Sequence, residues 1–250
     1  MNRELSRGQQ FWQIVATVVI IVYTVIPLLW ILNMSLKPSA DRADGKFWAH
    51  HPTLENYELI FAGGAKDLFL PALFNSVLVT IIATLIAVIL ATFCAYAIAR
   101  LDFPGKRLIL GTALTVSFFP VISLVTPLFD LWRRIHLFDT IPGLILPYLV
   151  LTLPLSIWTL SAFFQQIPWE MEQAAQVDGA TSWEAFRKVI VPLAAPGVFT
   201  TAIIAFFTAW NDFVFAISLT SDKARTVPAA LAFFTGASQF ESPTGAICAA

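Results

Sequence analysis

Charged side chains are scarce in this sequence, at 12% of 250 residues, whereas hydrophobic residues make up 58%. Soluble domains carry about 25% charged residues, so the composition argues against a soluble globular protein. Fifteen basic and sixteen acidic side chains give a net charge of −1, and this balance predicts no nucleic acid among the partners. The 22 Phe and 8 Trp residues suit a surface in contact with membrane lipid, with aromatic rings at its edges.

Cysteine and histidine are also rare. The two cysteines, Cys94 and Cys248, lie far apart in apolar stretches, and we expect two buried thiols. The histidines are His50, His51 and His136. No cysteine or third histidine lies close to the adjacent pair, so the sequence predicts no metal site.

No nucleotide-binding loop is present in the sequence. The phosphate-cradling pattern is Gly-x-x-x-x-Gly-Lys-Ser/Thr, and Gly45-Lys46 and Gly105-Lys106 lack the rest of it. No Ser/His/Asp grouping is evident either. We therefore predict a chain that is not an enzyme, with no catalytic residues and no cofactor of its own.

Five stretches contain no Asp, Glu, Lys or Arg, and they cover 8–36, 68–99, 108–129, 140–169 and 189–211. Each exceeds the roughly 20 residues that a helix needs to cross the hydrocarbon core. Because a single segment can satisfy its backbone in lipid only as a helix, we predict spans near 11–34, 72–100, 108–132, 142–165 and 194–219. Prolines that can kink these spans are Pro27, Pro120, Pro127, Pro147 and Pro154.

The last residues resemble the beginning of a further span. Segment 220–242 is polar, and an apolar run starts near 244 and reaches Ala250. The fold class expected is all-α, a polytopic transmembrane bundle in which residues 11–250 form one domain after a cytoplasmic segment 1–10. We expect six spans, of which the last is truncated in this sequence and continues in the native chain.

Residues 166–192, which we call the elbow, predict two short helices between the fourth and fifth spans. Pro168 suits the first position of a helix, and the left-handed conformation open to Gly179 predicts its end. Thr181 and Glu184 have the spacing of a capping box that starts a second helix, which Pro192 would end. From these residues alone, the elbow is either an amphipathic segment on the membrane surface or a docking surface.

The elbow closely resembles the EAA loop of ATP-binding-cassette (ABC) importer permeases. That pattern has Glu-Ala-Ala, three residues, Gly, and then Ile-x-x-Pro or a close relative. The positions that match are Ala174, Ala175, Asp178, Gly179, Ala180, Phe186, Ile190 and Pro192. The family Glu falls at Gln173, with Glu172 one place earlier, so the ion pair that this Glu would make with the ATPase is in doubt.

Other segments extend the resemblance over nearly the whole chain. They are Asn75-Ser76, Tyr96-Ala-Ile-Ala-Arg-Leu101, Phe103-Pro-Gly-Lys106, Leu137-Phe-Asp-Thr140, Gly143-Leu-Ile-Leu-Pro147 and Ala209-Trp-Asn-Asp212. Together they resemble the MalG-type permeases of carbohydrate ABC importers, and most of all the trehalose import permeases of actinobacteria. The resemblance implies a type I ABC importer permease fold.

It also implies partners and an orientation. The partners would be a second permease subunit, two ATPase subunits that hold ATP and Mg²⁺, an extracytoplasmic sugar-binding protein, membrane lipid and the sugar. The coupling residues would be Glu172, Gln173, Ala174, Ala175, Asp178, Gly179, Phe186 and Pro192. A cytoplasmic EAA loop after four spans places the N-terminus in the cytoplasm, which the distribution of Lys and Arg does not decide by itself.

Polar residues near the end of a span are candidates for the sugar path, because charge within a membrane is functional by default. We assign Asn75, Trp210, Asn211 and Asp212 to the path, with a capped or paired Asp212 at the outer interface as the alternative. A permease for glycerol phosphate or an oligosaccharide stays open. A secondary transporter is less favoured, since we find no internal repeat. A membrane enzyme would need a reactive cluster, which is missing, and a passive scaffold leaves the elbow unexplained.

Overall fold

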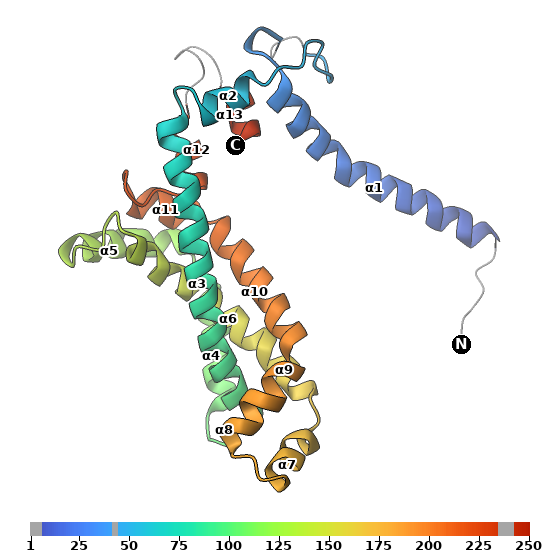
Figure 1. Ribbon diagram of the computed structural model, residues 1–250, viewed down its shortest axis with the longest axis vertical. Helices are drawn as coiled ribbons and strands as arrows, with labels where there is room; N and C mark the ends of the chain where they lie inside the picture. The colour runs from blue at the N-terminus through green and yellow to red at the C-terminus, as the bar shows by residue number, and fades with distance from the viewer. Residues whose placement is uncertain (1–6, 42–44, 235–242) are drawn as a thin grey trace. The chain divides into compact units, whose positions relative to one another are not determined.

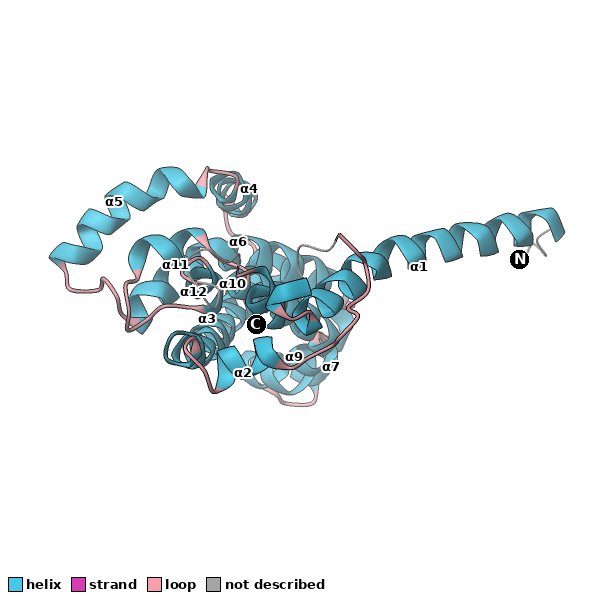
Figure 2. Cartoon of the chain, turned by 90° about the horizontal axis from the view of Figure 1, so that it is seen from above, coloured by secondary structure: helices cyan, strands magenta, loops and turns pink. Residues whose placement is uncertain are grey.

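The computed structural model describes residues 7–41, 45–234 and 243–250, and these ranges contain helices and loops without a β-strand (Figure 2). Part of the predicted cytoplasmic segment, 1–6, and part of the polar segment, 235–242, lie outside the described residues. The chain divides into two compact units, 1–70 with 230–250, and 71–229.

Helices in chain order are α1 (Arg7–Leu36), η1 (Ser39–Asp41), α2 (Glu55–Phe61), α3 (Lys66–Arg100), α4 (Lys106–Ser117), α5 (Val121–Arg134) and α6 (Ile141–Gln166). They continue with α7 (Trp169–Val177), α8 (Ser182–Ala185), the π-helix η2 (Phe186–Ile190), α9 (Val191–Leu193), α10 (Ala195–Trp210), α11 (Val214–Leu219), α12 (Val227–Leu231) and α13 (Thr244–Ala249).

Three of the described helices, α1, α3 and α6, are long and apolar enough to cross a bilayer, and the number rises to five if each of two bent helix pairs is one span. The fold class expected from the sequence, a polytopic all-α bundle, is therefore confirmed. A count of six spans stays a prediction.

In the smaller unit, buried polar side chains hold the loop that follows α1. The Asn56 side chain donates to the backbone oxygens of Ser35 and Lys37, at 2.8 and 2.9 Å. The ammonium of Lys37, only 2% exposed, donates to the backbone oxygen of Lys46 at 2.6 Å. These contacts satisfy polar groups that would be costly to bury alone, and they join the end of α1 to α2 and to Lys46.

In the larger unit, the centre of packing is a stripe of small residues on α3. Ala83, Ala87, Ala91 and Ala95 are spaced every fourth residue and are 0% exposed. Small side chains allow two membrane helices to approach closely, and Ala91 and Ala95 pack in one cluster with Leu160 and Phe164 of α6. Helix α10 packs on α6, as α4 does.

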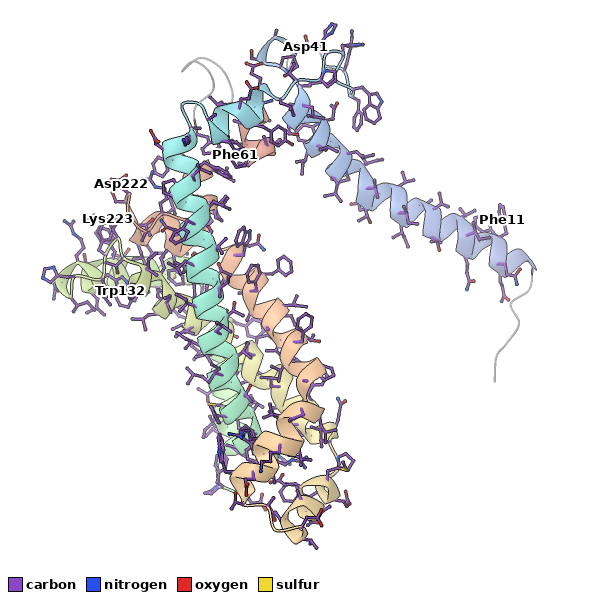
Figure 3. The ribbon with its side chains drawn as sticks, viewed as in Figure 1. Phe11, Asp41, Phe61, Trp132, Asp222 and Lys223 are labelled. Carbon is purple, nitrogen blue, oxygen red and sulfur yellow. The ribbon has the colours of Figure 1, made fainter. Side chains whose placement is uncertain are left out.

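The predicted third span, 108–132, is two helices rather than one. Helices α4 and α5 meet at an angle of 89° across Phe118-Phe119-Pro120. Proline lacks a backbone N–H and disfavours a helical residue before it, and Pro120 takes an extended conformation with φ −60° and ψ 114°. Trp132 of α5, labelled in Figure 3, donates from Nε1 to the backbone oxygen of Gly143 at 2.7 Å and ties α5 to α6.

The predicted fifth span, 194–219, is likewise divided. Helix α10 ends at Trp210 and α11 begins at Val214. Figure 1 shows α7 and α8 at one end of the larger unit and α11 at the other. The structure therefore separates the predicted coupling residues from the predicted path residues by the length of the bundle.

Candidate functional site

The first half of the elbow is a helix with well-defined ends. Helix α7 covers Trp169–Val177, as the sequence predicts, with Pro168 as its cap. Gly179 has φ +91°. Its N–H donates to Gln176 at 3.0 Å, and the Ala180 N–H donates to Ala175 at 2.9 Å. This is the Schellman arrangement that a glycine in the left-handed region permits, so the chain turns sharply after Asp178.

The second half begins with the predicted capping box. The Glu184 N–H donates to the Thr181 hydroxyl at 3.2 Å, and the Thr181 N–H donates to the Glu184 carboxylate at 3.1 Å. The helix then widens into η2, where a π-turn relaxes the local hydrogen-bond pattern. The element ends with α9 at Leu193, one residue after the end predicted at Pro192. The bend of 71° falls at Ala194, before α10.

The predicted coupling residues lie on two sides of the elbow. Gln173, Ala174, Asp178 and Gly179 are exposed, with Ala175 half-buried beside them. Glu172 and Phe186 face inward and are buried, and Pro192 is exposed further along. Val177, which sequence reasoning missed, is 87% exposed next to Asp178 and adds an apolar side chain to the outer surface of α7.

The inward side of α7 meets the end of α3 through charged and polar contacts. Tyr96 donates its hydroxyl to Glu172 at 2.5 Å, and the guanidinium of Arg100 lies 3.7 Å from the other carboxylate oxygen. Sequence reasoning assigned no role to Tyr96 or Arg100, although both lie in the Tyr96–Leu101 segment that carried part of the family resemblance.

Aromatic rings attach the second half of the elbow to the same helix. The Phe186 ring lies 4.6 Å from that of Tyr96 and 5.7 Å from that of Phe93, measured between centroids. Trp183 stacks on Phe186 at 5.4 Å and on Phe93 at 6.2 Å. Edge and offset contacts of this kind contribute beyond the area that they bury. Both halves of the elbow are thus packed on the last turns of α3.

At the opposite end of the larger unit, Asn75 and Asp212 bind the protein's own backbone. The Asn75 amide donates to the carbonyl oxygens of Lys223 and Arg225, at 2.8 and 3.0 Å. The Asp212 carboxylate accepts the Ala216 N–H at 3.1 Å and so caps α11, the arrangement considered as an alternative from the sequence.

The other two predicted path residues, Trp210 and Asn211, lie at the end of α10. Trp210 stacks on Phe206 with 5.7 Å between centroids. Asn211 is exposed and donates to the backbone oxygen of Phe207 at 2.9 Å. The structure places all four predicted path residues at the end opposite the elbow, where Figure 3 labels Asp222 and Lys223.

Asp139, a residue that sequence reasoning did not single out, organises this end. Its carboxylate accepts the four consecutive backbone N–H groups of 221–224, at 2.9 to 3.2 Å, and its own N–H donates to Leu219 at 2.9 Å. Burial by itself raises the pKa of Asp139, but these N–H groups outweigh burial and hold the pKa of this carboxyl below its ordinary value. The negative charge thereby fixes the turn after α11.

Over the described ranges, no group of three or more His, Cys, Asp and Glu side chains is placed to hold a metal ion. The exposed residues of the elbow form a surface on the outer side of α7 and on the turn after it, between α6 and α10 in the chain.

Residues 83–250 match the family described as the binding-protein-dependent transport system inner membrane component. The chain belongs to this family, and it is a component of an ABC transporter rather than a catalyst. Membership confirms the resemblance read from the elbow and implies that other transporter subunits and a binding protein act with it.

Relatives extend the match over almost the full chain. It is 56% identical over 245 residues to the trehalose transport system permease protein SugB of Mycobacterium tuberculosis, which covers 98% of this chain and 88% of the relative. It is 35% identical over 239 residues to the trehalose/maltose transport system permease protein MalG of Thermococcus litoralis, covering 95% and 85%. The predicted MalG-type resemblance is confirmed.

A third relative, the sulfoquinovosyl glycerol transport system permease protein SmoH of Agrobacterium fabrum, is 40% identical over 232 residues, covering 92% of this chain and 80% of the relative. Among solved structures, a chain of a bacterial ABC transporter that imports the acidic polysaccharide alginate superposes with a TM-score of 0.79 at 19% identity, over 99% of this chain and 93% of that one. This likeness shows the shared fold.

Proposed function

We propose that this chain is a permease subunit of an ATP-driven importer for a disaccharide of the trehalose type. The observation that carries the proposal is the exposed outer surface of α7, a docking surface built by local sequence signals on a chain whose relatives are sugar permeases. The similarity to SugB at 56% identity supports trehalose as the first sugar to test. The similarity to SmoH favours a second candidate, a glycoside of glycerol.

The proposed complex has a second permease, two ATPase subunits and an extracytoplasmic binding protein. ATP and Mg²⁺ bind in the ATPase subunits, since this sequence has no phosphate loop of its own. The elbow faces the cytoplasm, and so does the N-terminus, because four spans precede the elbow. Residues 11–250 form the permease domain.

Transport in this proposal is alternating access. Nucleotide binds one conformation of the complex better than the other, and that difference in affinity is the free energy available to shift the spans. The elbow carries it from the ATPase to the bundle. At the opposite end, Asn211 is the exposed residue among the four assigned to the path, and we assign it to the sugar; Asn75, Trp210 and Asp212 shape the wall around it.

Gly179 provides the experiment that tests this role of the elbow. A Cβ at Gly179 meets nothing within 4 Å, so a substitution acts through the backbone rather than through a clash. A β-branched residue in the left-handed region costs roughly 1–2 kcal/mol, and relief of that strain reorients the turn after α7. We expect Gly179→Val to insert in the membrane and to lose sugar-stimulated ATP hydrolysis and transport in the reconstituted complex.

Gly179→Asn is the matched control, because asparagine tolerates the left-handed conformation, and it should retain most activity. Gln173→Glu, which restores the family residue on the exposed side, should also be tolerated. Full transport with full capture of the ATPase subunit by Gly179→Val would show that the elbow is only a membrane-surface segment.

A further inference from the structure

Two opposite charges are buried together where α3 ends and α7 begins. The side chains of Arg100 and Glu172 are 5% and 6% exposed. Removing two charges from water is expensive, and the cost is recovered only when each binds the other and further partners. In contrast, the neighbouring pair of Lys106 and Asp102 has side chains that are 30% and 105% exposed, which is the ordinary state of a surface pair.

Arg100 contacts the chain on both sides of the start of α7. It donates from Nη2 to the backbone oxygen of Ile167 at 2.9 Å, and its guanidinium lies 4.9 Å from the centre of the Trp169 ring. With Glu172 as the third contact, one side chain holds the residues that lead into α7 and its first turn. The guanidinium suits this task because it is planar, always charged and offers several donors.

The connection between α6 and α7 makes this attachment consequential. Only Ile167 and Pro168 separate the two helices, and Pro168 provides no N–H for a helical hydrogen bond. This two-residue connection determines where α7 starts, but it does not determine how α7 is rotated about that point. Besides the packing of α7 on α8 and η2, Glu172 restrains this rotation, because its carboxylate lies between Arg100 and the hydroxyl of Tyr96.

We propose that Arg100 and Tyr96 are positioning residues that lock α7 to α3 through Glu172, so that a displacement of the elbow is transmitted directly to this span. This inference rests on the proposed function of the elbow. It also gives Glu172 a role distinct from docking, because the carboxylate points into the protein and the exposed residue beside it, Gln173, is uncharged. The surface offered to the ATPase therefore has no acidic group at this position.

The test compares two reconstituted complexes, one with the wild-type chain and one with Glu172→Gln, and measures how well ATP hydrolysis is coupled to transport. The amide still accepts the Tyr96 hydrogen bond but has no charge for Arg100. We expect the ratio of sugar-stimulated to basal ATP hydrolysis, and the number of trehalose molecules transported per ATP, to fall at least tenfold, with the ATPase subunit still captured. Hydrogen exchange should rise in 169–177, a change that loss of a docking contact alone would not produce in the isolated permease.

Asp102→Asn is the matched control, with the same loss of one charge at the same end of α3 but from an exposed pair, and it should couple as wild type does. If Glu172→Gln does not assemble, Tyr96→Phe removes a single hydroxyl and should reduce the coupling ratio several-fold. If the assembled Glu172→Gln complex, or the Tyr96→Phe complex, couples ATP hydrolysis to transport as well as wild type does, the proposed attachment of α7 to α3 through Glu172 is wrong. If wild type itself shows no sugar-stimulated hydrolysis, the proposed function fails instead.

Discussion

At the scale of single residues, Asp139 shows how a short side chain can order a turn that is distant in sequence. Its φ of 56° is uncommon for a non-glycine residue and is tolerated by Asp more readily than by most. In that conformation the carboxylate faces the N–H groups of 221–224. The turn beside the proposed outer end of the path is therefore held by one negative charge.

Asp139→Asn should loosen this turn. Hydrogen bonds to a charged group contribute about 1.5–3 kcal/mol, so we expect amide exchange in 221–224 to accelerate by roughly tenfold or more, as measured by hydrogen exchange of the purified protein at neutral pH. Asp222→Asn is the control, because its side chain is 83% exposed and pairs with Arg225 instead. Equal protection in wild type and Asp139→Asn would contradict the assignment.

The stabilisation of the same turn by the Asp139 carboxylate should depend on pH in a definite direction. The pKa of Asp139 in the folded protein lies below its ordinary value, which is about 3.9 for Asp. The stabilisation is therefore complete above that value and is lost as the pH falls through the lowered pKa. The difference between wild type and Asp139→Asn, corrected for intrinsic exchange rates, should be constant from neutral pH to about pH 5 and disappear in stronger acid.

Single residues were predicted well where the signal is local and poorly where it is not. The left-handed Gly179 and the Thr181–Glu184 capping box follow from neighbouring residues, so the sequence was sufficient to predict them. The inward direction of Glu172 depends on Tyr96 and Arg100, which lie more than seventy residues away. Asn75 resembles a path residue in sequence, but its amide binds a loop 150 residues later.

At the scale of elements, the approach of α10 to α6 depends on Gly197. A Cβ at this position would lie 2.4 Å from Phe163 Cγ, far inside van der Waals contact. Gly197→Ala should therefore destabilise the protein by about 1–3 kcal/mol, the usual cost of overpacking, and lower the midpoint of thermal unfolding in detergent.

Gly111→Ala in α4 is the matched control for this prediction, because a Cβ there meets nothing within 4 Å. Alanine is the better helix former by roughly 0.5–1 kcal/mol, so this variant should be neutral or slightly more stable. If the two variants shift the midpoint equally, close packing at Gly197 is not the cause.

The helices also show that periodicity and composition cannot locate a break within a predicted span. Apolar length identified the stretches that became α3 and α6, because a long apolar run has few alternatives to a helix. The break at 118–120 was not predicted, since several prolines occur in these stretches and Pro127, Pro147 and Pro154 lie inside continuous helices. The presence of a proline therefore does not by itself show which one divides a span.

At the scale of the whole molecule, the sequence contained most of the functional conclusion because the elbow is a nearly contiguous motif. Family membership and the relatives confirm the class of protein. The sugar path was not predictable to the same depth, because a path is built from residues of several helices and a partner permease that share no local pattern. Of the four residues proposed for it, three, Asn75, Asn211 and Asp212, bind the backbone of this chain.

We propose that this chain moves a sugar with energy supplied by partner ATPases. The most direct measurement is uptake of labelled trehalose by proteoliposomes that contain the complete complex and the binding protein, with ATP inside, or with a proton or sodium gradient and no ATP. We predict uptake that requires ATP and this chain, with no ATP hydrolysis by the chain alone. Gradient-driven uptake without ATP, or hydrolysis by the purified chain, would contradict the account.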